Sequence, residues 1–169
     1  MTAASAPPAT TAQVAVHRIP HLKAPPHEHP GHRRPVRQPA VAGLRKRIRQ
    51  ADGVLIATPE YNFSIPGGLK NAIDWVSRVD DQPFALKPVA MLSASPGPVG
   101  GARMQYDLRK VMLFLNAAPL VKPEVFIGGA GTRFDADGRC TDDSTRHVVG
   151  AQLLAFEQWI AAVGRMRGS

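Results

Sequence analysis

The sequence predicts an α/β fold in which helices cover both faces of a parallel sheet, and three observations support this class. From residue 40 onward, short apolar runs alternate with segments whose apolar residues recur at helical spacing, in the order α-β-α-β-α-β-α. The apolar runs are continuous, which is typical of strands covered on both faces. Polar or glycine-rich turns follow these runs. Such alternation implies right-handed crossovers and a three-layer architecture.

The first 38 residues differ in composition from the rest of the chain. Nine of the 21 Lys and Arg residues, but only one of the 13 acidic residues, lie within residues 1–50, so the net charge of +8 is concentrated there. We expect residues 1–38 to be a basic, Pro- and His-rich, largely irregular region, with one short edge strand over Val14–Leu22. Residues 39–169 are expected to form the folded domain.

The folded domain is predicted to begin with an amphipathic helix of about three turns. Val41, Leu44 and Ile48 recur at helical spacing after Pro39, and basic residues that include Arg45 fill the other faces. A turn then leads into the first buried strand.

The remaining elements follow from the same two patterns. The predicted strands are Val54–Ala57, Val89–Ser93 and Glu124–Gly128. Between the first two, we expect a helix with Ser64 as its N-cap and Pro66 in its first turn. The later helices are predicted over residues 102–116 and 144–163, with a polar loop from Gly128 to about Asp143 before the last one.

Composition limits the functional classes. No apolar run approaches the ~20 residues that span a bilayer, and the N-terminus has no apolar stretch that could serve as a signal-peptide core. We therefore expect a cytoplasmic protein with no membrane partner. The single cysteine, Cys140, excludes an internal disulfide, and its polar surroundings indicate an incidental surface thiol.

The first candidate site is the turn that follows the strand Val54–Ala57. It consists of Pro59, Glu60, Tyr61 and Asn62. In an open parallel sheet, ligands bind beyond the carboxyl ends of the strands, where proline leaves neighbouring backbone N–H groups free and the aromatic and amide side chains can contact a flat heterocycle. The alternative is an ordinary strand-to-helix turn, which often contains the same residue types.

The second candidate site follows the strand Val89–Ser93. Its expected ligand-binding residues are Ser95, Pro96, Gly97, Gly100 and Gly101. Glycines let a backbone approach a ligand closely, and the start of the next helix offers N–H groups and a positive dipole end. Taken alone, this pattern is weak, because such turns occur in every α/β protein.

Together, these segments resemble the NADPH-dependent FMN reductases, a flavodoxin-like family that includes chromate and quinone reductases. The shared motifs are P-E-Y-N with S-I-P-G-x-L-K-N-A-I-D-W after it, and S-P-G-x-x-G-G-x-R-x-Q, within a resemblance that covers about residues 39–163. The resemblance implies bound FMN, NADPH or NADH as electron donor, and a quinone, metal oxyanion or similar small acceptor. The flavin performs the chemistry, so we name no catalytic acid or base.

The resemblance also implies a homodimer or homotetramer. The helix that carries Trp75 is a candidate contact, and the alternative is that Trp75 packs against the sheet.

One family feature has no counterpart in this sequence. Relatives begin with a strand and a G-S-x-R-x-x-S-x-N loop that holds the FMN phosphate, whereas Val14–Leu22 better matches their second strand. A flavodoxin-like sheet would then lack its central strand. Arg33, Arg34 and Arg37 are possible replacement phosphate contacts. A simpler interpretation is a shortened or frame-altered member whose first 38 residues do not follow the family.

Other classes are less well supported by the residues. A basic N-terminal region fits nucleic acid, but it has no interleaved aromatic residues and no recognised binding motif, so we expect no nucleic-acid partner. His27, His29 and His32 could bind a metal, but no carboxylate or cysteine completes the set, so no metal site is predicted. The main alternative to an enzyme is a catalytically silent, truncated flavodoxin-like protein that acts by assembly with a partner.

Overall fold

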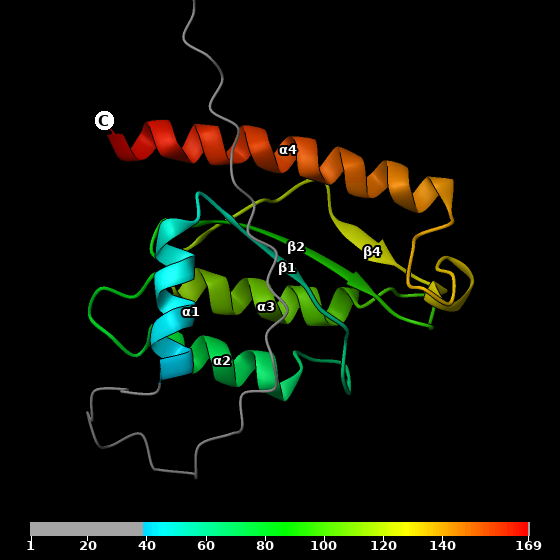
Figure 1. Ribbon diagram of the computed structural model, residues 1–169, viewed down its shortest axis with the longest axis horizontal. Helices are drawn as coiled ribbons and strands as arrows, with labels where there is room; N and C mark the ends of the chain where they lie inside the picture. The colour runs from blue at the N-terminus through cyan, green and yellow to red at the C-terminus, as the bar shows by residue number, and fades with distance from the viewer. Residues whose placement is uncertain (1–38, 169) are drawn as a thin grey trace, which may run out of the picture.

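The computed structural model describes residues 39–168 and shows an α/β fold (Figure 1). Its elements are α1 (Pro39–Gln50), β1 (Val54–Ala57), α2 (Gly67–Ser77), β2 (Pro88–Ala94), α3 (Ala102–Phe114), β3 (Ala118–Pro119), β4 (Val125–Ile127), the 3-10 helix η1 (Ala130–Thr132) and α4 (Asp143–Gly168). The expectations for residues 1–38, including the strand Val14–Leu22, lie outside the described residues. From Pro39 onward, each predicted helix and strand is present.

The sheet is parallel throughout, as predicted. β2 pairs with β1 along one edge, where Val54 lies opposite Val89. On its other edge, β2 pairs with β3 near its start and with β4 near its end, where Leu92 lies opposite Val125. β3 was not predicted, because a strand of only two residues has no periodicity to detect.

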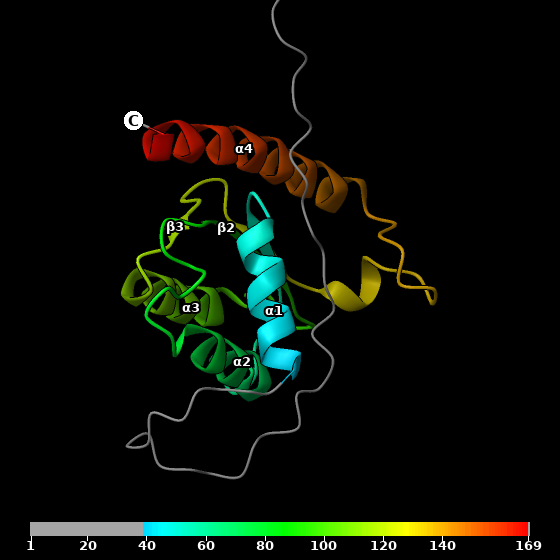
Figure 2. The same ribbon diagram turned by 60° about the vertical axis from the view of Figure 1, so that its left-hand side comes forward.

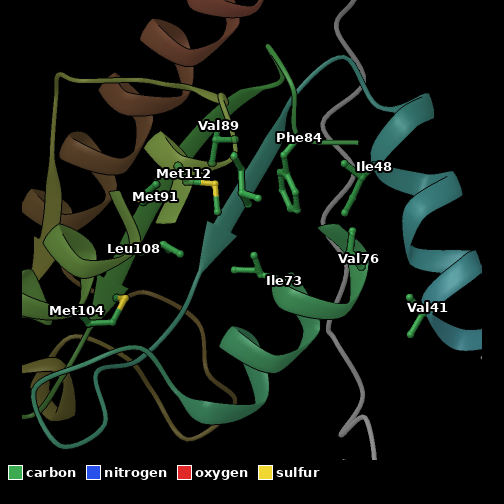
Figure 3. Close-up of a cluster of buried hydrophobic side chains, with 11 residues drawn as sticks. Val41, Ile48, Ile73, Val76, Phe84, Val89, Met91, Met104, Leu108 and Met112 are labelled. Atoms are coloured by element: carbon green, nitrogen blue, oxygen red, sulfur yellow. The ribbon is translucent and has the colours of Figure 1, made fainter. Parts of the chain in front are cut away.

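Helices lie on both faces of the sheet. α1, α2 and α3 cover one face and α4 covers the other, as the two views show (Figures 1 and 2). Side chains of α1–α3 meet those of the sheet in the larger core (Figure 3). This core consists of Val41, Ile48, Ile73, Val76, Phe84, Val89, Met91, Met104, Leu108, Met112 and Leu115. A smaller core under α4 contains Ala90, Leu120, Phe156 and Ile160. The three-layer prediction is confirmed.

The prediction that both faces of every strand are covered is wrong for β1. Its first three residues are only half-buried and Ala57 is exposed, whereas most of β2 is buried. Within residues 39–168, β1 pairs with no strand other than β2, so its second edge is not covered by a described strand. On α4, Leu153 is 40% exposed, although it lies at helical spacing from buried Phe156 and Ile160.

The start of α2 also differs from the prediction. The helix begins at Gly67, so Pro66 occupies the N-cap position and no side chain caps the helix. The hydroxyl of Ser64, the expected N-cap, instead donates a hydrogen bond to Asp107. Ser64 is thus tied to α3 and not to the helix that follows it.

Two buried cations, Arg45 and Lys87, cap helix ends, and the burial of Arg45 differs from the prediction. Arg45, placed on a solvent-facing side of α1, is buried and donates hydrogen bonds to the carbonyl oxygens of Val76 and Trp75 at the end of α2. Lys87 is buried as well, and its ammonium group donates to backbone carbonyls at the end of α1. Burial lowers the pKa of both side chains. A cation at a helix C-terminus satisfies carbonyls that have no partner within the helix.

Within the described part of the chain, no helix combines the length and the apolar character needed to cross a membrane.

Candidate functional site

The two predicted loops lie side by side beyond the carboxyl ends of β1 and β2. The first loop comprises residues 59–64 after β1, and the second loop comprises residues 95–101 after β2. Because the two strands are adjacent and parallel, their carboxyl ends meet at the same edge of the sheet. The carboxylate of Glu60 accepts a hydrogen bond from the backbone N–H of Met104, at 3.1 Å. A side-chain carbon added at Gly101 would lie 3.7 Å from the β-carbon of Glu60. The structure therefore brings the first loop against the second.

The first loop contains a tight turn from Tyr61 to Ser64. The backbone N–H of each of these two residues donates to the carbonyl oxygen of the other, at 3.1 and 2.9 Å. Between them, Asn62 and Phe63 have φ values of 48° and 66°. Two successive left-handed residues with this pairing describe a type I′ turn. Asn tolerates that conformation, whereas a bulky residue such as Phe seldom adopts it.

The first loop presents unpaired polar groups. Tyr61 is 61% exposed, and Asn62 and Pro59 are exposed as well. Among the described residues, the Asn62 amide, the Tyr61 hydroxyl and the N–H of Glu60 have no hydrogen-bond partner. By contrast, the N–H of Thr58 donates to Leu92 and continues the strand pairing. One ring and several donors are therefore free to meet a ligand at this end of the sheet.

In the second loop, Gly100 and Gly101 are buried against the protein itself. Their φ values are 62° and 83°, in the left-handed region. A side-chain carbon would lie 2.6 Å from the backbone of Phe126 at Gly100, and 2.8 Å from Ser93 at Gly101. The hydroxyl of Ser93 donates to the carbonyl of Gly100 at 2.6 Å. Packing therefore requires glycine at both positions, whether or not the backbone there also lies close to a ligand.

Ser95, Pro96 and Gly97 form the outer part of the second loop. The N–H of Ser95 donates to the carbonyl of Ile127, and the N–H of Gly129 donates to Gly97, so the loop is bound to the segment after β4. Pro96 and Gly97 are exposed, and a side-chain carbon at Gly97 would have no atom within 4 Å. This part of the loop leaves open space next to the sheet edge.

Buried Gln105 joins the second loop to the sheet. Its side-chain amide donates to the hydroxyl of Ser93 at 2.7 Å and to the carbonyl of Val125 at 2.8 Å. Gln105 is fully buried, so these bonds are shielded from water. Although it lies in the motif that carries the family resemblance, the sequence did not identify this structural role.

The sequence also missed two residues of α3, Arg103 and Asp107, that contact the first loop. The guanidinium of Arg103 lies 4.1 Å above the centroid of the Phe63 ring, and it forms an ion pair of 3.4 Å with Glu60. The carboxylate of Asp107 accepts a hydrogen bond of 2.8 Å from the hydroxyl of Ser64. Hydrogen bonds from Lys110 and Ser64 lower the pKa of Asp107. The available signal was the four-residue spacing of Arg103 and Asp107, which places both on one face of α3.

The site offers no metal ligands within the part of the chain that the structure describes. No group of three or more His, Cys, Asp or Glu residues there is arranged to hold a metal ion. His27, His29 and His32 lie outside that part. Free backbone N–H groups, an amide and an exposed aromatic ring instead match the edge and faces of a flat heterocycle with carbonyl groups, such as a flavin ring.

Comparison with a family model gives a match to the NADPH-dependent FMN reductases over residues 2–132. The match begins well before Pro39, so it extends further toward the N-terminus than the motifs indicated.

Curated relatives carry corresponding names. The chain is 52% identical over 130 residues to an NAD(P)H-dependent FMN reductase of Pseudomonas aeruginosa, covering 77% of this chain and 69% of the relative. It is 50% identical over 124 residues to a quinone reductase of Escherichia coli K12, with 73% and 66% of the two chains covered. An NAD(P)H:quinone oxidoreductase of Solanum tuberosum is 46% identical over 70% of this chain and 61% of its own length. The chain thus spans roughly two thirds of the length of the relatives it matches.

A solved structure gives the same result. The flavoenzyme NAD(P)H:acceptor oxidoreductase FerB of Paracoccus denitrificans superposes with a TM-score of 0.69 at 37% identity, over 75% of this chain and 70% of FerB. An oxidoreductase of Corynebacterium diphtheriae, with a TM-score of 0.57 at 14% identity, supports the fold alone. On this evidence, the chain belongs to the NADPH-dependent FMN reductase family.

Proposed function

We propose that this chain is an NAD(P)H-dependent, FMN-containing oxidoreductase. It takes electrons from NADPH or NADH and passes them through the flavin to a quinone, a metal oxyanion or a similar small acceptor. Family membership and the names of the relatives support this proposal. The observation that carries it is the meeting of the two loops at the carboxyl ends of β1 and β2, joined by the hydrogen bond from Met104 to Glu60.

The residues proposed to hold the flavin are those of the two loops. They are Pro59, Glu60, Tyr61, Asn62, Ser95, Pro96, Gly97, Gly100 and Gly101. The free N–H of Glu60 and the amide of Asn62 would bond the ring edge, and Tyr61 would contact the ring. At Gly100 and Gly101, the absence of a side chain would let the backbone lie close to the ring. When bound, FMN supplies hydride and electron transfer, so the chain needs no acid or base of its own.

Titration of the purified chain with FMN tests the proposal. We expect quenching of flavin fluorescence, followed by NADPH oxidation that depends on an added quinone. Asn62→Asp keeps a residue that tolerates positive φ but removes the amide donor, so it should weaken FMN binding about fivefold or more. Asn116→Asp is the matched control, because Asn116 also has a positive φ, of 51°, but lies in neither loop. Absence of quenching at high micromolar FMN would favour the catalytically silent alternative.

Riboflavin separates the two ends of the cofactor. The sequence has no counterpart of the family's phosphate loop, and each charge-assisted hydrogen bond contributes roughly 1.5–3 kcal/mol. If the two loops alone hold the flavin, FMN and riboflavin should bind within about threefold of each other. Much tighter binding of FMN would point to phosphate contacts from elsewhere, with Arg33, Arg34 and Arg37 as the first residues to replace.

We further propose that the protein assembles into a homodimer or homotetramer. Tyr106 and Leu113, seven residues apart on α3, are 51% and 78% exposed, and Phe114 is 84% exposed. Clustered exposed apolar side chains of this kind are typical of interaction sites. Trp75 is half-buried and packs against the larger core, which favours the packing alternative for that residue. Light scattering should give at least twice the monomer mass, and Phe114→Asp should lower it.

A cytoplasmic location and the division of the chain near Pro39 stay predictions from the sequence.

A further inference from the structure

We propose that Arg103 and Asp107 of α3 are positioning residues that hold the Tyr61–Ser64 turn in its left-handed conformation. The inference about the turn rests on described contacts, and its consequence for flavin affinity rests on the proposed function. Neither residue is among those proposed to contact the flavin.

The turn needs support from outside itself. Asn62 and Phe63 both have positive φ, and Phe63 is a residue that rarely adopts this conformation. Burial does not supply that support, because Tyr61 is 61% exposed and Phe63 is 67% exposed. A strained, exposed turn persists only when surrounding contacts fix it.

α3 supplies those contacts on both sides of Asn62. Before it, the carboxylate of Glu60 accepts the N–H of Met104 at 3.1 Å and pairs with Arg103 at 3.4 Å. After it, the Phe63 ring lies 4.1 Å from the guanidinium of Arg103.

The last residue of the turn, Ser64, donates its hydroxyl to Asp107 at 2.8 Å. The lowered pKa of Asp107, due first to its hydrogen bond with Lys110 and then to that with Ser64, agrees with a carboxylate that stays charged and accepting. Residues on either side of Asn62 are therefore fixed, while among the described residues its own amide has no partner.

This arrangement makes a specific prediction about coupling. A ligand that binds only the formed turn loses affinity in proportion to the population of that turn. Replacing Arg103 by Met removes the stacked cation and should weaken FMN binding about fivefold. Phe63→Gly removes both the strain and the ring, since glycine adopts positive φ without cost. In the Phe63→Gly protein, Arg103→Met should therefore cost less FMN affinity than in the wild type, because only the ion pair of Arg103 with Glu60 is then lost.

The experiment is this double-mutant cycle, measured by FMN fluorescence and by hydrogen exchange of the Ser64 amide in flavin-free protein. Arg139→Met is the matched control, because the exposed Arg139 side chain pairs with Asp137 and, among the described residues, forms no hydrogen bond with either loop. We expect Arg103→Met and Asp107→Asn to speed Ser64 exchange about fivefold, and Arg139→Met to leave it unchanged.

The two readouts distinguish the possible failures. Unchanged Ser64 exchange in Arg103→Met and Asp107→Asn would overturn the positioning role, whether or not the protein binds flavin. An equal loss of FMN affinity from Arg103→Met in both backgrounds would also overturn it, because Arg103 would then not act through the Phe63 ring. If the wild-type chain binds no FMN while the exchange result holds, the proposed function fails and the positioning role stands.

Discussion

The two loops at the carboxyl edge of the sheet are held in different ways. The loop after β2 is fixed from inside, with Gly100 and Gly101 buried and Ser93 bonded beneath them. The loop after β1 is exposed and is fixed from outside, through side chains of α3 that reach Glu60, Phe63 and Ser64. The second loop is therefore part of the core, whereas the first loop is attached to the core through α3.

This difference predicts different responses to substitution. Changes beneath the second loop should destabilise the protein, because they disturb close-packed backbone. Changes at the first loop should leave most of the stability in place and should act on ligand binding, because the contacts there are few and partly exposed. Four substitutions test this contrast, in order of decreasing effect on stability.

The largest effect is expected from Gly100→Ala. The added carbon would meet the backbone of Phe126 at 2.6 Å, and the φ of 62° is unfavourable for alanine. Overpacking and backbone strain together should lower the free energy of unfolding by about 3 kcal/mol, measured by urea denaturation. Gly97→Ala, where no atom lies within 4 Å, is the control and should change it by less than about 0.5 kcal/mol. Equal losses of stability from Gly100→Ala and Gly97→Ala would contradict the proposal that packing around Gly100 fixes the second loop.

Gln105→Met comes next. It leaves the hydroxyl of Ser93 and the carbonyl of Val125 without their bonds to the Gln105 amide, so the free energy of unfolding should fall by roughly 1–3 kcal/mol. Gln152→Met is a useful comparison, because buried Gln152 donates to Met91 and Pro123 from α4, on the other face of the sheet. Both variants should lose stability, but only Gln105→Met should also weaken FMN binding at 25 °C. A similar loss of binding in both would show that the effect is global.

Glu60→Gln should have a smaller effect on stability. The amide oxygen can still accept the N–H of Met104, but the charge near the start of α3 and the ion pair with Arg103 are lost. Charges at helix N-termini contribute about 0.3–1 kcal/mol, so we expect a loss within that range by urea denaturation. FMN affinity should fall by more than this stability loss alone would cause. Glu157→Gln, at an exposed position on α4, should change neither quantity.

Asp107→Asn should give the smallest effect, and one that depends on pH. The folded-state pKa of Asp107 lies below its ordinary value of 3.8, so the charged form contributes stability that is present above pH 3.8 and is lost as the pH falls through the folded-state pKa. The difference in melting temperature between wild type and Asp107→Asn should therefore be largest near pH 7 and should shrink below pH 3.8. A difference that grows on acidification would contradict the hydrogen bonding of Asp107 by Lys110 and Ser64.

Local sequence patterns predicted most of the fold between residues 39 and 168. The strand Val54–Ala57 was predicted with its observed bounds, and a helix of about three turns was predicted from Pro39, where α1 begins. The wrong placements of Arg45 and Ser64 have a common cause, because both side chains bond to residues distant in the sequence. Arg45 was placed in solvent, yet it caps α2 through Val76, 31 residues away, and no local pattern encodes such a partner.

For the candidate site, the sequence predicted the positions of the two loops but not all of their contacts. The position of both loops followed from strand ends, glycines and the family motifs, and the structure brings the two loops together. The contacts of Phe63 and Asp107 did not follow, because they depend on which face of α3 turns toward the first loop.

By itself, the sequence determined the order of helices and strands, the family and the two loops, because periodicity and turn chemistry are properties of neighbouring residues. Only the tertiary structure decided that Gly100 and Gly101 are packed against β4 and Ser93, and that α3 holds the Tyr61–Ser64 turn. These properties depend on residues that are distant in the chain and become neighbours only when the sheet and helices pack.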